Sequence, residues 1–187
     1  MQSAEGGRAT GAVPPVTADD HARGPVDAPL VVVQYGDYDC PHTRKSSESL
    51  RALEGDLGVP IRLVFRHFPL RHLHPNAQAF AEIAEASAAV GSFWEAHDQL
   101  MGHHRGRGPL ELLDDMRALG VDVDAVRQRL GSAAVVERIE RDVKAGAGAG
   151  VHTTPTWFFN GMFWDGHYDA ATLAERARLA LPTPRSA

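Results

Sequence analysis

The sequence predicts an α/β fold in which a parallel strand pair is followed by a block of helices and then by a hairpin and a closing helix. An apolar run at residues 30–35 has the length of a strand that is buried on both faces. A second strand is expected at residues 59–68, after a helical segment, so that a β-α-β unit with a right-handed crossover lies in the first half of the chain. Strand character returns only at residues 156–164, around the hairpin signal Asn160-Gly161.

Helical patterns account for the rest of the expected order. A helix is expected at residues 41–57, where leucines recur at helical spacing. The other expected helices are residues 77–90, 92–101 (beginning at a Ser92–Glu95 capping box), 110–119, 122–130, 132–145 and 170–181. Glycine and alanine alternate at residues 145–150, which fits a fraying helix end or a close helix packing. A phosphate-binding loop would need a preceding strand and a lysine, and neither is present there.

The composition is that of an ordinary globular protein and argues against several classes of function. The 187 residues are 43% hydrophobic and 23% charged, which is enough for one domain with a sizeable core. The formal net charge of -5 argues against nucleic acid and against an anionic membrane surface as partners. No stretch approaches the roughly 18 apolar residues of a membrane helix, and no secretory signal is visible. We therefore expect a cytoplasmic protein.

We expect a single domain between two tails. The first 19 residues are rich in Gly, Ala, Thr and Pro and are expected to form a flexible N-terminal tail. The domain is expected to span residues 20–182, with an irregular lead-in at residues 20–29 and a helical insertion at about residues 75–148. Residues 183–187 are expected to form a C-terminal tail.

Cys40, the only cysteine of the chain, stands where the first strand passes into a helix. Pro41 follows it, and proline is favoured at the first position of a helix. The unpaired N–H groups and the dipole of a helix N-terminus favour an anion such as a thiolate. The backbone N–H groups of His42 and Thr43, the Thr43 hydroxyl and a protonated His42 would all stabilise that thiolate. We therefore expect a reactive thiol rather than the small buried hydrophobe that a lone cysteine often forms.

Five stretches, in the same order along the chain, resemble the DsbA-like thiol–disulfide oxidoreductases of bacteria. The stretches are GPVDAP at residues 24–29, YGDYDCPH at residues 35–42, FRHFPL at residues 65–70 with HP at 74–75, FWEAHD at residues 93–98 and GVHTTPTWFFNG at residues 150–161. The resemblance spans nearly the whole chain. It implies a thioredoxin-like fold with a helical insertion and an activity of thiol–disulfide exchange.

The resemblance also implies how the site is built. The loop Thr154-Pro155 resembles the cis-proline loop of the family, and the backbone edge of Thr154 would lie beside the Cys40 sulfur and pair with an extended substrate chain. Trp157, just after this loop, is expected to contact substrate as well. The catalytic residues that the resemblance implies are Cys40, Pro41, His42 and Thr43.

The chain departs from the family at one position that decides the mechanism. The family pattern is Cys-x-x-Cys, whereas this sequence has Cys40-Pro41-His42-Thr43 and no other cysteine. A single chain therefore cannot store an internal disulfide. We expect a monothiol mechanism, in which Cys40 forms a mixed disulfide with a protein or small-molecule partner. An outside thiol must then resolve the mixed disulfide, and its source stays open between a low-molecular-weight thiol acting as co-substrate, a partner protein and a second copy of the chain. We expect no cofactor.

Two other functions stay open at this point. A glutathione-transferase-like or isomerase-like enzyme would use the helix N-terminus to activate a bound small thiol, with Cys40 or Thr43 polarising it. A catalytically inactive module would keep the groove and bind extended peptides. The sequence leaves the oligomeric state, the physiological substrate and the direction of exchange open.

Several histidines invite a metal interpretation, which their spacing does not favour. They are His67, His72, His74, His97, His103 and His104. Zinc sites need three or four converging ligands, usually with a fixed local spacing. Neither His72-x-His74 nor His103-His104 has a cysteine or a paired carboxylate beside it. We therefore expect no metal site. Glu82 and Glu85 are expected to lie on the solvated face of their helix.

Overall fold

The computed structural model of the chain describes residues 12–102 and 106–182. Five strands within these residues form one sheet, in the order β1-β3-β2-β4-β5. The strands are β1 (His21–Arg23), β2 (Leu30–Gly36), β3 (Ile61–His67), β4 (Thr156–Phe159) and β5 (Met162–Trp164). β2 lies in the centre, parallel to β3 and antiparallel to β4. The predicted β-α-β unit and the predicted hairpin of β4 and β5 are therefore confirmed.

The edge strand β1 is a difference from the sequence prediction. Residues 21–23 were expected to belong to an irregular lead-in, but they pair antiparallel with Leu63–Phe65 of β3. Gly24 follows the strand and ends it. Its backbone has φ +90°, and a Cβ atom there would lie 2.1 Å from the carbonyl oxygen of Ile61, so this close approach requires glycine.

The helices agree with the predicted order, with small shifts at their ends. They are α1 (Pro41–Asp56), α2 (Ala77–Ala88), α3 (Phe93–Gly102), α4 (Pro109–Asp115), the 3₁₀ helix η1 (Met116–Leu119), α5 (Val123–Arg127), α6 (Ala133–Gly148) and α7 (Ala170–Ala180). The expected helix at residues 110–119 is divided into α4 and η1, because its last turn tightens before Gly120 takes a left-handed conformation. None of the described helices is long and apolar enough to cross a membrane.

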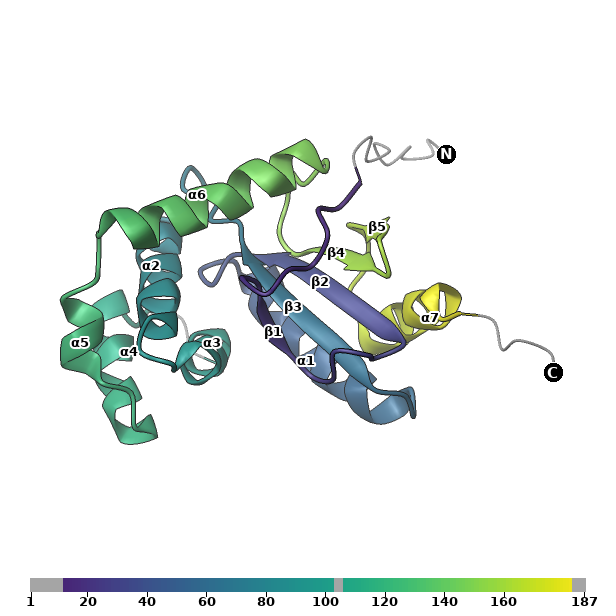
Figure 1. Cartoon of the computed structure of the whole chain (residues 1–187), viewed down its shortest axis with the longest axis horizontal. Helices are drawn as coiled ribbons and strands as arrows, with labels where there is room; N and C mark the ends of the chain where they lie inside the picture. The colour runs from purple at the N-terminus through teal and green to yellow at the C-terminus, as the bar shows by residue number, and fades with distance from the viewer. Residues whose placement is uncertain (1–11, 103–105, 183–187) are drawn as a thin grey trace.

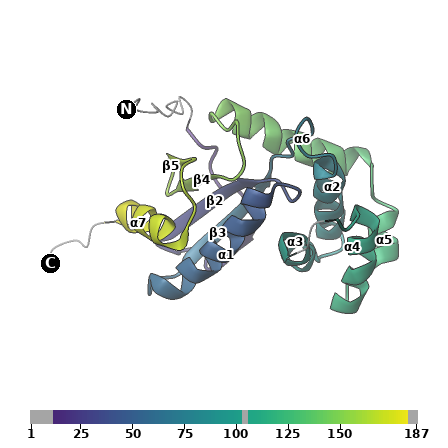
Figure 2. The same ribbon diagram turned by 180° about the vertical axis from the view of Figure 1, so that it is seen from behind.

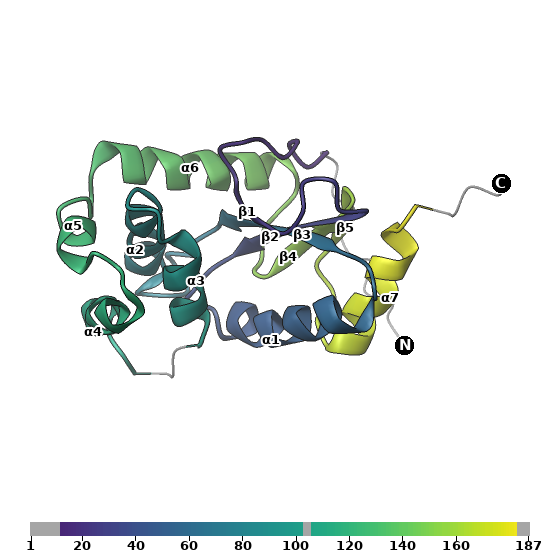
Figure 3. The same cartoon turned by 60° about the horizontal axis from the view of Figure 1, so that its bottom comes forward.

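Helices cover both faces of the sheet (Figures 1 and 3). α1 and α7 lie on one face, and α6 lies with the N-terminal segment over the other. Successive side chains along each strand point to opposite faces of the sheet, so the core residues fall into two clusters, one on each face. Val32 and Phe159 belong to the cluster shared with α1 and α7, whereas Val33 and Phe158 belong to the cluster on the opposite face.

The helical insertion, α2 to α6, lies mainly beyond one end of the sheet (Figures 1 and 2). It has a hydrophobic core of its own, which includes Phe80, Leu100 and Ile139. Tyr38 and Phe65 reach into this core from the ends of the two parallel strands. The strand ends that carry the expected site are therefore in contact with the insertion.

The described part of the predicted tail, residues 12–19, packs against the sheet. The Arg66 guanidinium donates to the carbonyl oxygens of Pro14 and Pro15 at 3.1 Å each and to the Asp20 carboxylate at 2.8 and 3.0 Å. Burial alone would raise the pKa of Asp20, but its hydrogen bonds to Arg66 and Thr17 outweigh this, and the pKa is lowered. The predicted flexible tail is therefore too long. The rest of it, residues 1–11, and the predicted C-terminal tail at 183–187 lie outside the described residues.

Candidate active site

The thiol of Cys40 lies against the loop that precedes β4. Cys40 is the N-cap residue of α1, and Pro41 begins the helix, as predicted. The Cys40 Sγ–H donates a hydrogen bond to the carbonyl oxygen of Thr154 at 3.3 Å. The peptide bond between Thr154 and Pro155 is cis, as the resemblance implied. Two segments 114 positions apart therefore form one site.

The Cys40 thiol is buried, and it is not bonded to the helix N–H groups that were expected to contact it. Only 2% of Cys40 and 7% of Thr154 are exposed. The N–H groups of His42 and Thr43 were expected to point at the sulfur, but Cys40 makes no side-chain capping bond to the first turn of α1. The S–H donates to the Thr154 carbonyl instead. Attack by Cys40 therefore requires this bond to break as the proton leaves.

Thr43 occupies the position of the second family cysteine and is fully buried. Its hydroxyl oxygen accepts a hydrogen bond of 3.4 Å from the backbone N–H of Asp37. No hydrogen bond joins it to the Cys40 sulfur in the described geometry, so the expected donation to the thiolate is not formed. The Thr43 side chain instead links the first turn of α1 to the turn after β2. Gly36 allows this packing, because a Cβ there would lie 3.0 Å from the Thr43 methyl group and 2.5 Å from the Phe65 ring.

His42 is exposed at the start of α1 and contacts a residue that the sequence did not single out. Its Nδ1 lies 2.6 Å from the hydroxyl oxygen of Tyr168, and the two rings meet edge to face with centroids 5.9 Å apart. Tyr168 stands just before α7, 126 positions along the chain. No local pattern marks Tyr168, because only the closed fold brings α7 beside α1.

Asp37 holds the turn that carries Cys40, and sequence reasoning missed this role. Its buried carboxylate accepts hydrogen bonds from the N–H of Leu70 at 2.9 Å, from Nδ1 of His74 at 2.7 Å and from the N–H of Asp39 at 2.8 Å. Asp39 in turn accepts from the N–H of Asn76 at 2.9 Å. Asp37 and Asp39 therefore join the turn after β2 to the loop after β3.

Trp157 does not line the substrate side of the site, so its expected role is wrong. Its side chain is fully buried in the cluster shared with α1 and α7. The alternation along β4 explains this placement, because Trp157 and Phe159 point to one face of the sheet and Phe158 to the other. The sequence alone did not show which face each aromatic side chain occupies.

The six histidines considered for a metal site are scattered. His74 binds Asp37, His72 is exposed, and His103 and His104 lie outside the described residues. His97 is buried, with Nδ1 3.0 Å from the Tyr38 hydroxyl. Burial places the pKa of His97 well below its ordinary value and raises that of Tyr38 well above its own, so both side chains are neutral near pH 7.

Glu85 is a clear correction to the sequence analysis. It was expected on a solvated helix face, but its carboxylate is mostly buried and bonds to His21 and His67. Burial would raise its pKa, but these two hydrogen bonds outweigh the burial and hold the pKa of Glu85 well below its usual range. Glu85 therefore carries a negative charge at the junction of the sheet and the insertion.

Two hollows lie beside α1. One, of about 460 Å³, lies between the turn after β2 and the insertion and is lined by Asp39, Pro41, Arg44 and His74 among others. The other, of about 310 Å³, lies farther along α1, between Lys45 and Ser49 on one side and residues 167–170 on the other.

A lone thiol at the N-terminus of the helix after the central strand, held against a cis-proline loop, defines a thioredoxin-like protein. The inserted helices place it among those with a DsbA-like architecture. The sequence model of the thioredoxin family matches residues 16–176, and the chain belongs to this family.

Curated relatives are much longer than this chain. It is 40% identical over 172 residues to "Na(+)/H(+) antiporter NhaA 3" of Salinispora tropica, a match that covers 91% of this chain and 26% of that protein. It is 37% identical over 161 residues to "Na(+)/H(+) antiporter NhaA" of Herminiimonas arsenicoxydans, covering 86% and 25%. The chain thus spans about a quarter of the length of these relatives.

Solved structures share the fold. A thioredoxin-like oxidoreductase from Silicibacter pomeroyi matches with a TM-score of 0.74 and 23% identity, over 87% of this chain and 94% of that one. BdbD from Bacillus subtilis matches with a TM-score of 0.75 and 19% identity, over 86% and 92%. The thiol-disulfide exchange protein α-DsbA2 from Wolbachia pipientis matches with 0.72 and 20%, over 84% and 85%. The predicted thioredoxin-like fold is confirmed.

Proposed function

We propose that this protein is a thiol–disulfide oxidoreductase that works through one cysteine. The observation that carries the proposal is the position of the Cys40 sulfur, 3.3 Å from the Thr154 carbonyl oxygen and beside the cis bond to Pro155. An extended substrate that pairs with the backbone edge of Thr154 would bring its disulfide to this sulfur. The family membership and the DsbA-like fold support the same class of reaction.

The reaction proceeds in three exchanges. Cys40 loses its proton and attacks one sulfur of the substrate disulfide; the S–S bond breaks, the other sulfur leaves as a thiolate, and Cys40 is left in a mixed disulfide. Because Thr43 offers no second thiol, one external low-molecular-weight thiol attacks the Cys40 sulfur of the mixed disulfide, and the second substrate sulfur leaves as a thiolate. A second external thiol then attacks the sulfur of the first, and Cys40 leaves as a thiolate. Two such thiols reduce one substrate disulfide and leave as their own disulfide, so electrons and protons balance. The hollow of about 460 Å³ beside Pro41 is a place for this co-substrate.

We assign His42 and Tyr168 a tuning role in this site. His42 lies two residues after the thiol, at the start of the same helix, and its ring is oriented by the 2.6 Å contact with the Tyr168 hydroxyl. An imidazole held in this way places an oriented polar ring at the helix N-terminus that carries the thiol. Thr43 acts through packing, since its hydroxyl is engaged by the N–H of Asp37.

A disulfide-reduction assay tests the proposal. Insulin or a fluorescent peptide disulfide is incubated with excess glutathione, and the initial rate is compared for wild type, Cys40→Ser and the exposed-residue control His72→Ala. We expect wild type and His72→Ala to accelerate the reaction equally and Cys40→Ser to fall to the uncatalysed rate. A Cys40→Ser variant with the wild-type rate would contradict the proposal.

The covered thiol favours one alternative, a binding module without catalysis. With 2% of Cys40 exposed, the loop at Thr154 and Pro155 could bind an extended chain without exchanging disulfides. In that case all three proteins would be inactive in the assay and would bind an extended peptide equally well. Conjugation of glutathione to an electrophile, retained in Cys40→Ser, would point instead to a transferase.

A further inference from the structure

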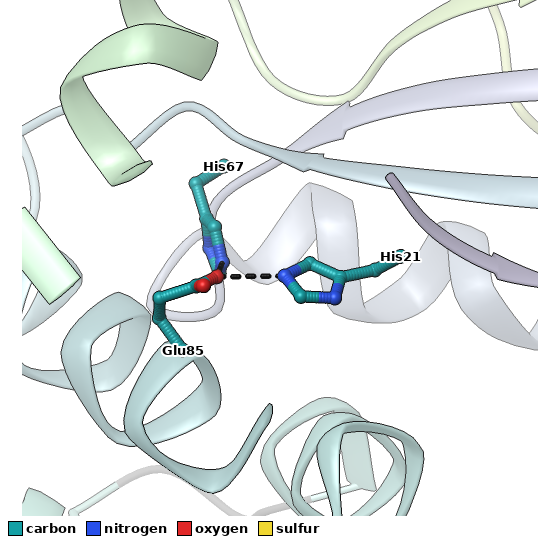
Figure 4. A group of neighbouring side chains, drawn as sticks. All are labelled: His21, His67 and Glu85. Atoms are coloured by element: carbon teal, nitrogen blue, oxygen red, sulfur yellow. Dashed lines mark hydrogen bonds and ion pairs between the residues drawn. The ribbon is translucent and has the colours of Figure 1, made fainter. Parts of the chain in front are cut away.

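His21, His67 and Glu85 come together from three different elements (Figure 4). His21 belongs to β1, His67 to the end of β3 and Glu85 to α2. Nε2 of His21 lies 2.6 Å, and Nε2 of His67 3.2 Å, from the same carboxylate oxygen, Oε2 of Glu85. One ligand atom from each residue lies within 4.8 Å of the other two.

This set of side chains has the chemistry of a zinc site. Two imidazoles and one carboxylate, with a fourth position taken by water, form a known class of tetrahedral Zn²⁺ coordination. With metal–ligand distances of about 2.0–2.2 Å, tetrahedral ligand atoms lie roughly 3.3–3.6 Å apart. The distances of 2.6 and 3.2 Å are slightly short of this, so a small outward movement of the Glu85 carboxylate makes room for an ion. Ca²⁺ and Mg²⁺, which prefer oxygen ligands, do not fit two imidazoles.

The two imidazole rings are held in place by packing. His21 stacks on Phe93 with ring centroids 3.6 Å apart and planes 10° from parallel. His67 is fully buried, meets Phe65 edge to face, and its backbone N–H donates to Asp142 at 3.0 Å. Ligands fixed in this way lose little conformational entropy when an ion binds.

The charge and the exposure of the cluster also suit a cation. Glu85 supplies a carboxylate oxygen and each histidine supplies one ring nitrogen to the cluster. The nearby cationic side chain of Arg138 is already paired with Asp142. The side chains of His21 and Glu85 are each 13% exposed, which leaves an opening for the ion and for a water ligand.

We propose that His21, His67 and Glu85 bind one divalent transition-metal ion of the Zn²⁺ class, which joins the edge strand, the central sheet and the helical insertion. The site replaces our expectation of no metal. Sequence spacing could not reveal it, because Glu85 lies 64 and 18 positions from the two histidines. Nδ1 of His67 has no hydrogen-bond partner among the described residues. A missing outer partner predicts an affinity about 10- to 100-fold below that of a zinc site with a complete outer shell.

A metal titration tests the proposal on the full chain without a histidine tag. The Cys40→Ser background removes the thiol as a competing ligand. We expect one equivalent of Zn²⁺ by calorimetry and, with Co²⁺, the visible absorption of a tetrahedral site with nitrogen and oxygen ligands. Zinc at about 100 times its Kd should raise the Tm by roughly 5–10 °C. His21→Ala and Glu85→Gln should each weaken binding at least tenfold.

Matched controls and a direct view of the ion make the outcome decisive. His72→Ala, an exposed loop histidine, and a variant without His103 and His104 should bind zinc as tightly as the background protein. If the cluster is only a hydrogen-bonded triad, zinc will leave the Tm unchanged, and this result overturns the proposal. If a variant fails to fold, a zinc-soaked crystal of the background protein decides: an anomalous peak between the three side chains supports the site, and a peak elsewhere or none overturns it.

Discussion

The side chains around the thiol carry out separate tasks. Cys40 supplies the sulfur, and Thr154 supplies both the carbonyl that accepts its S–H and the backbone edge proposed for substrate. Asp37 holds the turn after β2 through three hydrogen bonds, and the Tyr168 hydroxyl orients the ring of His42. The thiol is therefore held in a defined position before any substrate arrives, which favours a reactive geometry.

His97 makes the protein sensitive to acid. Burial lowers the pKa of His97 far below 6.5, and the nearby charges of Arg23 on β1, His67 on β3, Arg51 on α1 and His21 on β1 lower it further. The unfolded chain therefore takes up a proton near pH 6.5 that the folded chain does not, and stability falls as the pH drops below about 6.5. The contribution is up to about 1.4 kcal/mol per pH unit.

Urea unfolding between pH 7.5 and 5.5, with a chelator present, measures this effect. His97→Asn keeps a polar atom near the position of Nδ1, within reach of the Tyr38 hydroxyl, and removes the titrating ring. We expect the free energy of unfolding of this variant to fall less steeply with pH than that of wild type. If the free energy of unfolding falls equally steeply with pH in wild type and in His97→Asn, His97 is not the cause of the acid sensitivity.

The helix α6 crosses one face of the sheet at a position where only glycine fits. A Cβ at Gly146 would lie 2.8 Å and 2.9 Å from atoms of the Tyr35 ring and 3.0 Å from the Phe68 ring. Both rings belong to the core on this face. Of the two interpretations of the glycine–alanine alternation, close helix packing is confirmed, because the helix continues to Gly148.

Two neighbouring substitutions test this packing. Gly146→Ala should lower the free energy of unfolding by about 1–3 kcal/mol through overpacking, although alanine is the better helix former. Gly148→Ala, two residues along α6, meets no atom within 4 Å and should be neutral or stabilising by up to about 1 kcal/mol. Urea denaturation of both variants provides the measurement. Equal effects at the two positions would rule out the close contact.

The whole fold could be predicted where its signals are local. The apolar run of β2, the Asn160-Gly161 turn and the helix stops are short-range patterns. The motif around Cys40 placed the thiol at the start of a helix, and the family resemblance of residues 150–161 placed the cis-proline loop. Asn160 and Gly161 both take positive φ angles, as this hairpin turn requires.

Other features depend on tertiary contacts and could not be found in this way. The short strand β1 exists because the edge of β3 offers a partner, not because of its own pattern. Tyr168 and Glu85 gain their roles only when distant elements meet. Trp157 follows the cis-proline loop in sequence but turns into the core, because its position in β4 decides which face it occupies.

We propose that Cys40 can start a disulfide exchange and that only an external thiol can complete it. Reaction with 5,5′-dithiobis(2-nitrobenzoate), followed by absorbance and intact mass, tests it most directly. Thr43→Cys serves as the comparison, since it restores the two-thiol pattern at a buried position three residues after Cys40.

We predict that wild type releases one equivalent of the aromatic thiolate and keeps one aryl group in a mixed disulfide until glutathione is added. Thr43→Cys should release two equivalents and keep none, because its second thiol resolves the mixed disulfide internally. Cys40→Ser should release none. A wild-type protein that forms no mixed disulfide, or that loses it without added thiol, would contradict the account.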